Sequence, residues 1–129
     1  MRHFTIAART NDKRVVIAVH VYETREQMLT AAQAFNGDVL SPTTEGVTQA
    51  FHDYWQPQAV IRYCYPHLHT HVLLHELVHA AQVAYRWTSP TIGKPATEHF
   101  THYNEDFAHL VSDLHTALHV QLARRFTIT

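Results

Sequence analysis

The sequence has little of what would indicate a secreted, membrane-bound or nucleic-acid-binding protein. Its one cysteine, Cys64, excludes an intramolecular disulfide, and we expect it to be a small buried residue on a strand. The formal net charge is −1 with the histidines neutral, so the chain offers no basic surface for nucleic acid. No apolar run has the length of a signal-peptide core or a membrane span. These absences predict a cytoplasmic protein without nucleic-acid or membrane partners.

Residues 1–129 are expected to form one domain, because no stretch rich in proline, glycine or serine divides the chain. Hydrophobic residues make up 46 % of the chain and charged residues 16 %, a composition that excludes a disordered protein. Histidine departs from this ordinary composition: there are 13, several-fold above usual usage, and they are dispersed rather than in a run. A functional interpretation therefore starts from their spacing.

Hydrophobic periodicity and turn residues predict an α+β fold. The expected strands are residues 3–8, 15–22, 47–55 and 58–65. The expected helices are residues 23–35, residues 70–87, and a last helix from about 99 or 104 to 124. Thr24 and Gln27 have the spacing of a capping box, and Gly37 suits the left-handed position after the first helix. The fold class is thus a short, mostly antiparallel N-terminal sheet with one helix, followed by two long packed helices.

The motif H-E-x-x-H occurs at His75, Glu76 and His79, inside the stretch LLHELVHAAQ. With 13 histidines and 6 glutamates in 129 residues, a shuffled chain would contain such a motif about 6 % of the time. The choice between a zinc-binding helix and chance therefore depends on context.

That context is the face on which the motif lies. The expected helix places His75, His79 and Gln82 on one narrow stripe, and apolar side chains cover most of the remaining circumference. This pattern predicts a buried helix whose polar stripe is turned toward a crevice. Imidazoles at i and i+4 can bind one ion, and Glu76 stands beside that ion as a general base for its water. The side chains expected opposite the stripe are Leu73, Leu77, Ala81 and Ala84.

A catalytic zinc site needs a third protein ligand, and the last helix offers one. The apolar stripe of that helix consists of Phe107, Leu110, Val111, Leu114, Leu118 and Leu122. A second stripe, of one acid and two small residues, consists of Glu105, Ala108 and Ser112. Small residues let another helix approach closely, so we expect Glu105 to reach across to the two histidines.

Two stretches, HELVHAA at 75–81 and NEDFAHLVSDL at 104–114, resemble the gluzincin metallopeptidases. In this thermolysin-like clan a glutamate on the next helix completes the HExxH site, and the likeness is strongest to small single-domain HExxH proteins of phages and bacteria. It covers about residues 72–118 and implies a minimal zincin-like fold with one Zn²⁺ per chain. It also implies His75, His79 and Glu105 as zinc ligands and Glu76 as the general base. Metzincins are not favoured, because HELVHAAQVAYRW lacks their glycine and third histidine.

Other roles stay open at this level. His109 stands where thermolysin-like enzymes place an aspartate that orients a ligand histidine, and this departure weakens that role. Tyr103, His102 and His109 are candidates for polarising the scissile carbonyl on position alone. His102 is also the alternative third ligand, as in SprT-like proteases that act on DNA-bound proteins, although the chain lacks a basic surface. A non-catalytic zinc-binding or interaction module is the other alternative.

The remaining histidines are expected to be structural. His67, His69 and His71 precede the motif, and a polar rim or hydrogen-bonded caps are favoured over a second metal site. His115 and His119 repeat the i, i+4 spacing without an acid between them, which favours a surface pair.

The sequence thus predicts a zinc-dependent metallopeptidase that acts on a peptide or protein substrate. The strand over 58–65 comes just before the active helix, so we expect it to form the cleft edge along which an extended peptide pairs. The loop over 88–97 would then form another wall. Neither the substrate preference nor the oligomeric state follows from the sequence.

Overall fold

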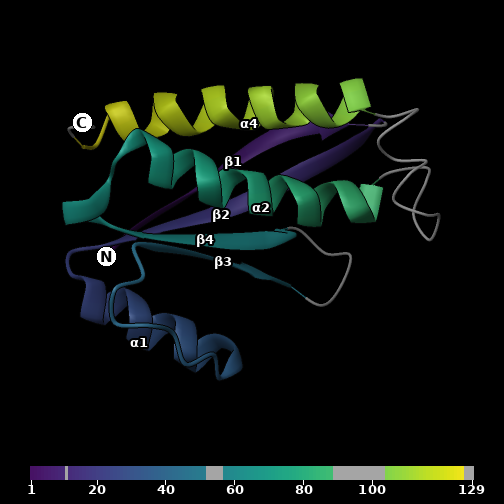
Figure 1. The fold of residues 1–129 in the computed structure, drawn as a ribbon. Helices are drawn as coiled ribbons and strands as arrows, with labels where there is room; N and C mark the ends of the chain where they lie inside the picture. The colour runs from purple at the N-terminus through teal and green to yellow at the C-terminus, as the bar shows by residue number, and fades with distance from the viewer. Residues whose placement is uncertain (11, 52–56, 89–103, 127–129) are drawn as a thin grey trace.

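The computed structural model describes residues 1–10, 12–51, 57–88 and 104–126. Within these ranges a four-stranded sheet has helices on both faces (Figure 1). The strands are β1 (Arg2–Thr10), β2 (Lys13–Tyr22), β3 (Gly46–Ala50) and β4 (Ala59–Cys64). The helices are α1 (Arg25–Asn36), α2 (Thr70–Thr88) and α4 (Asn104–Ala123), with a 3₁₀ turn at Tyr65–His67. The α+β class predicted from the sequence is confirmed, and no described helix is long and apolar enough to cross a membrane.

The sheet is mixed, with strand order β1-β2-β4-β3. β1 and β2 form the expected antiparallel hairpin, and β3 pairs antiparallel with β4. β2 and β4 are parallel, with α1 in the connection between them. Parallel strands need such a crossover, so the segment that contains α1 has to pass over one face of the sheet. Of the described helices, α1 accordingly lies on the face opposite α2 and α4 (Figure 1).

One expectation about the sheet is wrong. The strand before α2 is not a cleft edge, because β4 lies between β2 and β3 and all six of its residues are buried. Both sides of its backbone are therefore used in pairing. In the part of the sheet that the structure describes, the strand beside α2 that lies at an edge is β3. Among the described strands, the other edge is β1, which lies beneath α4 (Figure 1).

The capping signals of α1 are confirmed. The Thr24 hydroxyl accepts a hydrogen bond from the Gln27 amide, and the Gln27 side chain accepts one from the Thr24 amide, at 3.2 and 3.3 Å. Gly37 ends the helix at φ 82°, a left-handed conformation that costs glycine little.

α1 is held to the sheet by a buried polar network. Arg62 on β4 donates to the Gln49 side chain on β3 at 2.7 Å, and Gln49 donates to the Ala32 carbonyl at 2.9 Å. The Arg62 guanidinium also lies over the Phe35 ring. Because each buried polar group has a partner, the network fixes α1 against β3 and β4 without leaving an unpaired donor at these contacts.

The main core lies between the sheet and the two long helices. The predicted inner side of α2 is buried, and the leucine stripe of α4 is buried with it, as expected. The two helices contact each other, with the rings of Tyr85 and Phe107 5.5 Å apart at an angle of 72°. Cys64 is buried on β4, also as expected. The core residues on these helices are Val72, Leu73, Leu77, Ala80, Ala81, Ala84, Tyr85, Leu110, Leu114, Leu118 and Leu122.

The second stripe of α4 does not face α2. Glu105, Ala108 and Ser112 are all exposed, so the expectation that small residues bring the helices together is wrong. Because successive residues of a helix are rotated by about 100°, the stripe of Glu105, Ala108 and Ser112 lies on a different face of α4 from the leucines. Burying four leucines and Phe107 stabilises α4 more than burying two small side chains, and that difference sets the rotation of the helix.

Candidate metal centre

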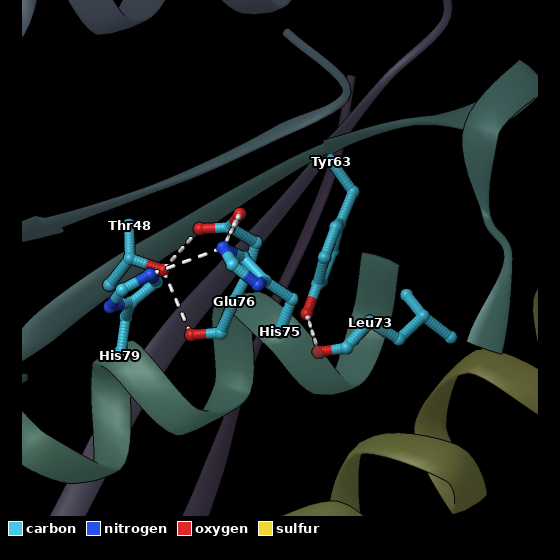
Figure 2. A network of polar contacts seen from close by, with 6 residues as sticks. All are labelled: Thr48, Tyr63, Leu73, His75, Glu76 and His79. Atoms are coloured by element: carbon cyan, nitrogen blue, oxygen red, sulfur yellow. Dashed lines mark hydrogen bonds and ion pairs between the residues drawn. The ribbon is translucent and has the colours of Figure 1, made fainter. Parts of the chain in front are cut away.

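His75 and His79 lie one turn apart on α2, and their rings meet (Figure 2). The two Nε2 atoms are 3.2 Å apart, and the ring centroids are 4.8 Å apart at an angle of 80°. Both residues are exposed, so within the described part of the chain the polar stripe faces solvent and not an enclosed crevice. The helical spacing brings the nitrogens together, as the sequence predicts.

The separation of the two nitrogens fits a shared ion. Imidazole nitrogens bind zinc at about 2.0–2.1 Å with tetrahedral geometry, which keeps two such ligands about 3.3 Å apart. The observed 3.2 Å matches this spacing. A single N–H···N hydrogen bond, with one Nε2 atom protonated as the donor and the other as the acceptor, gives a similar distance. The two histidines therefore meet the geometric requirement for half of a tetrahedral site.

Glu76 follows the first histidine but points in a different direction, toward the sheet (Figure 2). It is 8 % exposed, and its Oε1 atom lies 2.9 Å from the hydroxyl of Thr48 on β3. Its Oε2 atom lies 3.9 Å from His75 Nε2. The carboxylate thus stands beside the paired nitrogens at the boundary between the core and solvent, where a base could receive a proton from a water near them.

Tyr63 on β4 lies under the same part of α2 (Figure 2). Its hydroxyl donates to the Leu73 carbonyl at 2.8 Å. Burial raises the pKa of the Tyr63 hydroxyl well above its ordinary value, and the negative charge of Glu76 raises it further. Tyr63 is therefore a neutral hydrogen-bond donor that fixes α2 on the sheet, and it is buried away from any substrate.

The expected third ligand is not beside the two histidines. Glu105 is in the first turn of α4 with its side chain 87 % exposed, and its Oε2 atom lies 3.6 Å from His109 Nε2. His109 is exposed as well. The described residues contain no group of three or more histidine, cysteine, aspartate or glutamate side chains that is arranged to hold a metal ion. Two other candidates, His102 and Tyr103, lie outside the described residues, so the structure brings together His75, Glu76 and His79 and leaves Glu105 and His109 as a separate pair.

No protein-family model, curated protein or solved structure matches this chain. A functional assignment therefore depends on the chemistry of its own residues.

The three histidines around the start of α2, His67, His69 and His71, take part in structural contacts. His67 Nε2 lies 3.0 Å from Arg25 Nη2, and its Nδ1 lies 3.7 Å from a Glu45 oxygen. The rings of His69 and His71 are stacked 5.8 Å apart. A structural role was expected for this cluster, and these contacts agree with it.

The second i, i+4 pair differs from the surface pair that we expected. His115 and His119 are half-buried, with ring centroids 4.3 Å apart. Their Nε2 atoms are buried and have no hydrogen-bond partner among the described residues. Burial lowers the pKa of His115 below its ordinary value, and the neighbouring His119 lowers it further.

Sequence reasoning missed two residues that seat Glu76. Thr48 contacts the carboxylate, and Gly46 begins β3 beneath the Glu76 side chain. The alternation of a strand places residues 46 and 48 on one face, and this is the only local signal. Which helix covers that face depends on the strand order, which local patterns do not determine.

Proposed function

We propose that this protein is a zinc-dependent metallopeptidase whose metal is held by His75 and His79 and whose general base is Glu76. The observation that carries the proposal is the 3.2 Å separation of the two Nε2 atoms beside a partly sequestered carboxylate. Imidazole suits zinc among the first-row metals, and a carboxylate next to two such ligands is the arrangement used to activate water.

When bound, zinc supplies a Lewis acid that polarises a carbonyl and makes a water molecule more acidic. The residues of the chain supply the proton transfers. Glu76 receives the proton of the attacking water, with its Oε2 atom on the side of His75, and then gives it to the amine that leaves. A carboxylate that its neighbours hold in place is already oriented for these transfers, so less conformational entropy is lost on reaching the transition state.

The substrate is proposed to pair with β3. This strand is an edge of the sheet and lies under α2, and its Thr48 contacts the general base directly. An extended peptide that adds to a free strand edge gains main-chain hydrogen bonds, and this mode would bring its carbonyls past Glu76. The substrate is accordingly a peptide or an unfolded protein segment.

For the third ligand, the sequence pattern favours Glu105, with His102 as the alternative. Glu105 reaches the histidines only if its side chain leaves His109 and the start of α4 approaches α2. Metal binding supplies the free energy for such a rearrangement, because ligands that are separate in the free protein are brought together by the ion.

The deciding experiment is zinc content per chain, measured by mass spectrometry on untagged protein. We expect one zinc in the wild type, and loss or strong weakening in His79→Ala and Glu105→Ala. His119→Ala is the matched control, since it removes a histidine from the other i, i+4 pair and should leave the zinc in place. Zinc that is unaffected by His79→Ala would refute the site, and zinc that is lost only in His102→Ala would move the third ligand to that residue.

A non-catalytic zinc-binding module is the second candidate, and the separation of Glu105 from the histidines favours it. Hydrolysis of a mixed peptide library by zinc-loaded wild type and Glu76→Gln separates the two functions. A metallopeptidase loses turnover in Glu76→Gln and keeps its zinc. A binding module cleaves nothing in either form.

A further inference from the structure

We propose that Thr48 is a positioning residue that holds the carboxylate of Glu76 in one orientation, so that Oε1 is bound to the edge strand and Oε2 is left for proton transfer. This inference rests on the proposed function, because it names how the general base of that same site is kept in place. The contact joins β3 to α2, two elements that are distant in the sequence and lie side by side in the folded protein (Figure 2).

The geometry of Thr48 directs its single hydroxyl proton. The Oγ1 atom lies 2.9 Å from Glu76 Oε1 and 2.9 Å from the Glu76 main-chain carbonyl oxygen. A hydroxyl has one proton to donate, and a charged carboxylate is the stronger acceptor. The Glu76 carbonyl also has the helix amide four residues later as its regular donor. The proton of Thr48 therefore goes to Oε1.

Gly46 supplies the space that this orientation needs. A Cβ atom at Gly46 would lie 2.9 Å from Glu76 Cγ and 3.3 Å from Val72 Cγ1, closer than side chains normally approach. The stem of Glu76 thus passes over a position on β3 where only glycine fits without displacement. Two residues further along the same face of the strand, the Thr48 hydroxyl meets the end of the side chain.

The consequence is a general base that is fixed at both ends. Its stem is confined over Gly46, and Oε1 is bound by Thr48. Oε2 is then the oxygen on the side of His75, 3.9 Å from Nε2. Within the described part of the chain, both polar contacts of the Thr48 hydroxyl are with Glu76, so its removal acts on the base and not on the two histidines.

Thr48→Val tests this, because it keeps the shape of the side chain and removes the hydroxyl. We expect kcat to fall between about tenfold and a hundredfold, the usual effect of a misplaced catalytic group, with KM and zinc content unchanged. Thr48→Ser restores the hydroxyl and should recover most of kcat. Thr5→Val, on the exposed face of β1, is the matched control and should behave as wild type. A Thr48→Val protein with wild-type kcat would overturn the proposal.

A second measurement does not depend on activity. In ¹³C-labelled, metal-free protein, scalar couplings report whether Glu76 occupies one side-chain rotamer or several. We expect one rotamer in the wild type and in Thr48→Ser, and averaging over several in Thr48→Val. If the wild type hydrolyses nothing, the proposed function fails, and the couplings still decide the role of Thr48. The same single rotamer in Thr48→Val would refute that role.

Gly46→Ala provides the alternative variant if Thr48→Val does not fold. Its added Cβ atom pushes against the stem of Glu76 and leaves the Thr48 hydroxyl intact. The Glu76 couplings should change and kcat should fall, again with zinc retained. Unchanged couplings in Gly46→Ala would show that β3 does not determine the position of Glu76.

Discussion

At the scale of single residues, the candidate centre lies at the boundary between the solvent-exposed side of α2 and its buried side. His75 is exposed, whereas Glu76 and Tyr63 are buried where α2 meets the sheet. Two hydroxyls on neighbouring strands bind the helix from below, Thr48 at Glu76 and Tyr63 at the Leu73 carbonyl. The helix is thus fixed at the turn that carries the motif.

The Tyr63 contact can be separated from the chemistry. Tyr63→Phe removes one buried hydrogen bond to a carbonyl that keeps its helical donor, so we expect a loss of about 1 kcal/mol in the free energy of unfolding. Chemical denaturation measures this loss, and zinc content should not change. A loss of zinc in Tyr63→Phe would mean that its hydroxyl is needed to place the histidines as well as to hold the helix.

At the scale of elements, the orientation of α4 decides which of its stripes contacts the rest of the protein. The leucines are buried, whereas Ala108 is exposed beside the acid that was expected to cross to α2. Leu114→Ala should cost about 2–5 kcal/mol, because it opens a cavity in the core. Ala108→Glu should change the unfolding free energy by less than about 0.5 kcal/mol, as at an ordinary surface position. Strong destabilisation by Ala108→Glu, measured by denaturant unfolding, would return the small-residue stripe to the helix interface.

At the scale of the whole molecule, local patterns predict what local interactions determine. The β1–β2 hairpin, the Thr24 cap and the buried side of α2 follow from periodicity and capping chemistry, and the structure confirms them. The central place of β4 could not be predicted, because it results from parallel pairing with β2 across the whole α1 segment. The contact of Thr48 with Glu76 depends on that strand order. The rotation of α4 about its axis likewise depends on which of its two stripes gains more from burial, and the sequence of one helix does not determine this.

Stability against pH is a property of the whole fold, and two histidines, His20 and His115, contribute to it in the same direction. Burial lowers the pKa of His20, with smaller contributions from Arg62 and His3, and burial with His119 lowers the pKa of His115. Each has a folded-state pKa below the ordinary 6.5, so near and below that pH the unfolded chain binds more protons than the folded chain. The unfolding free energy should therefore fall as the pH drops below about 6.5 and level off once both folded-state groups are protonated.

Urea unfolding of metal-free protein between about pH 5 and 8 measures this dependence. His115→Gln should flatten the curve, because it removes one of the two groups. An equally steep curve in His115→Gln would show that the buried Nε2 atoms on α4 do not oppose protonation.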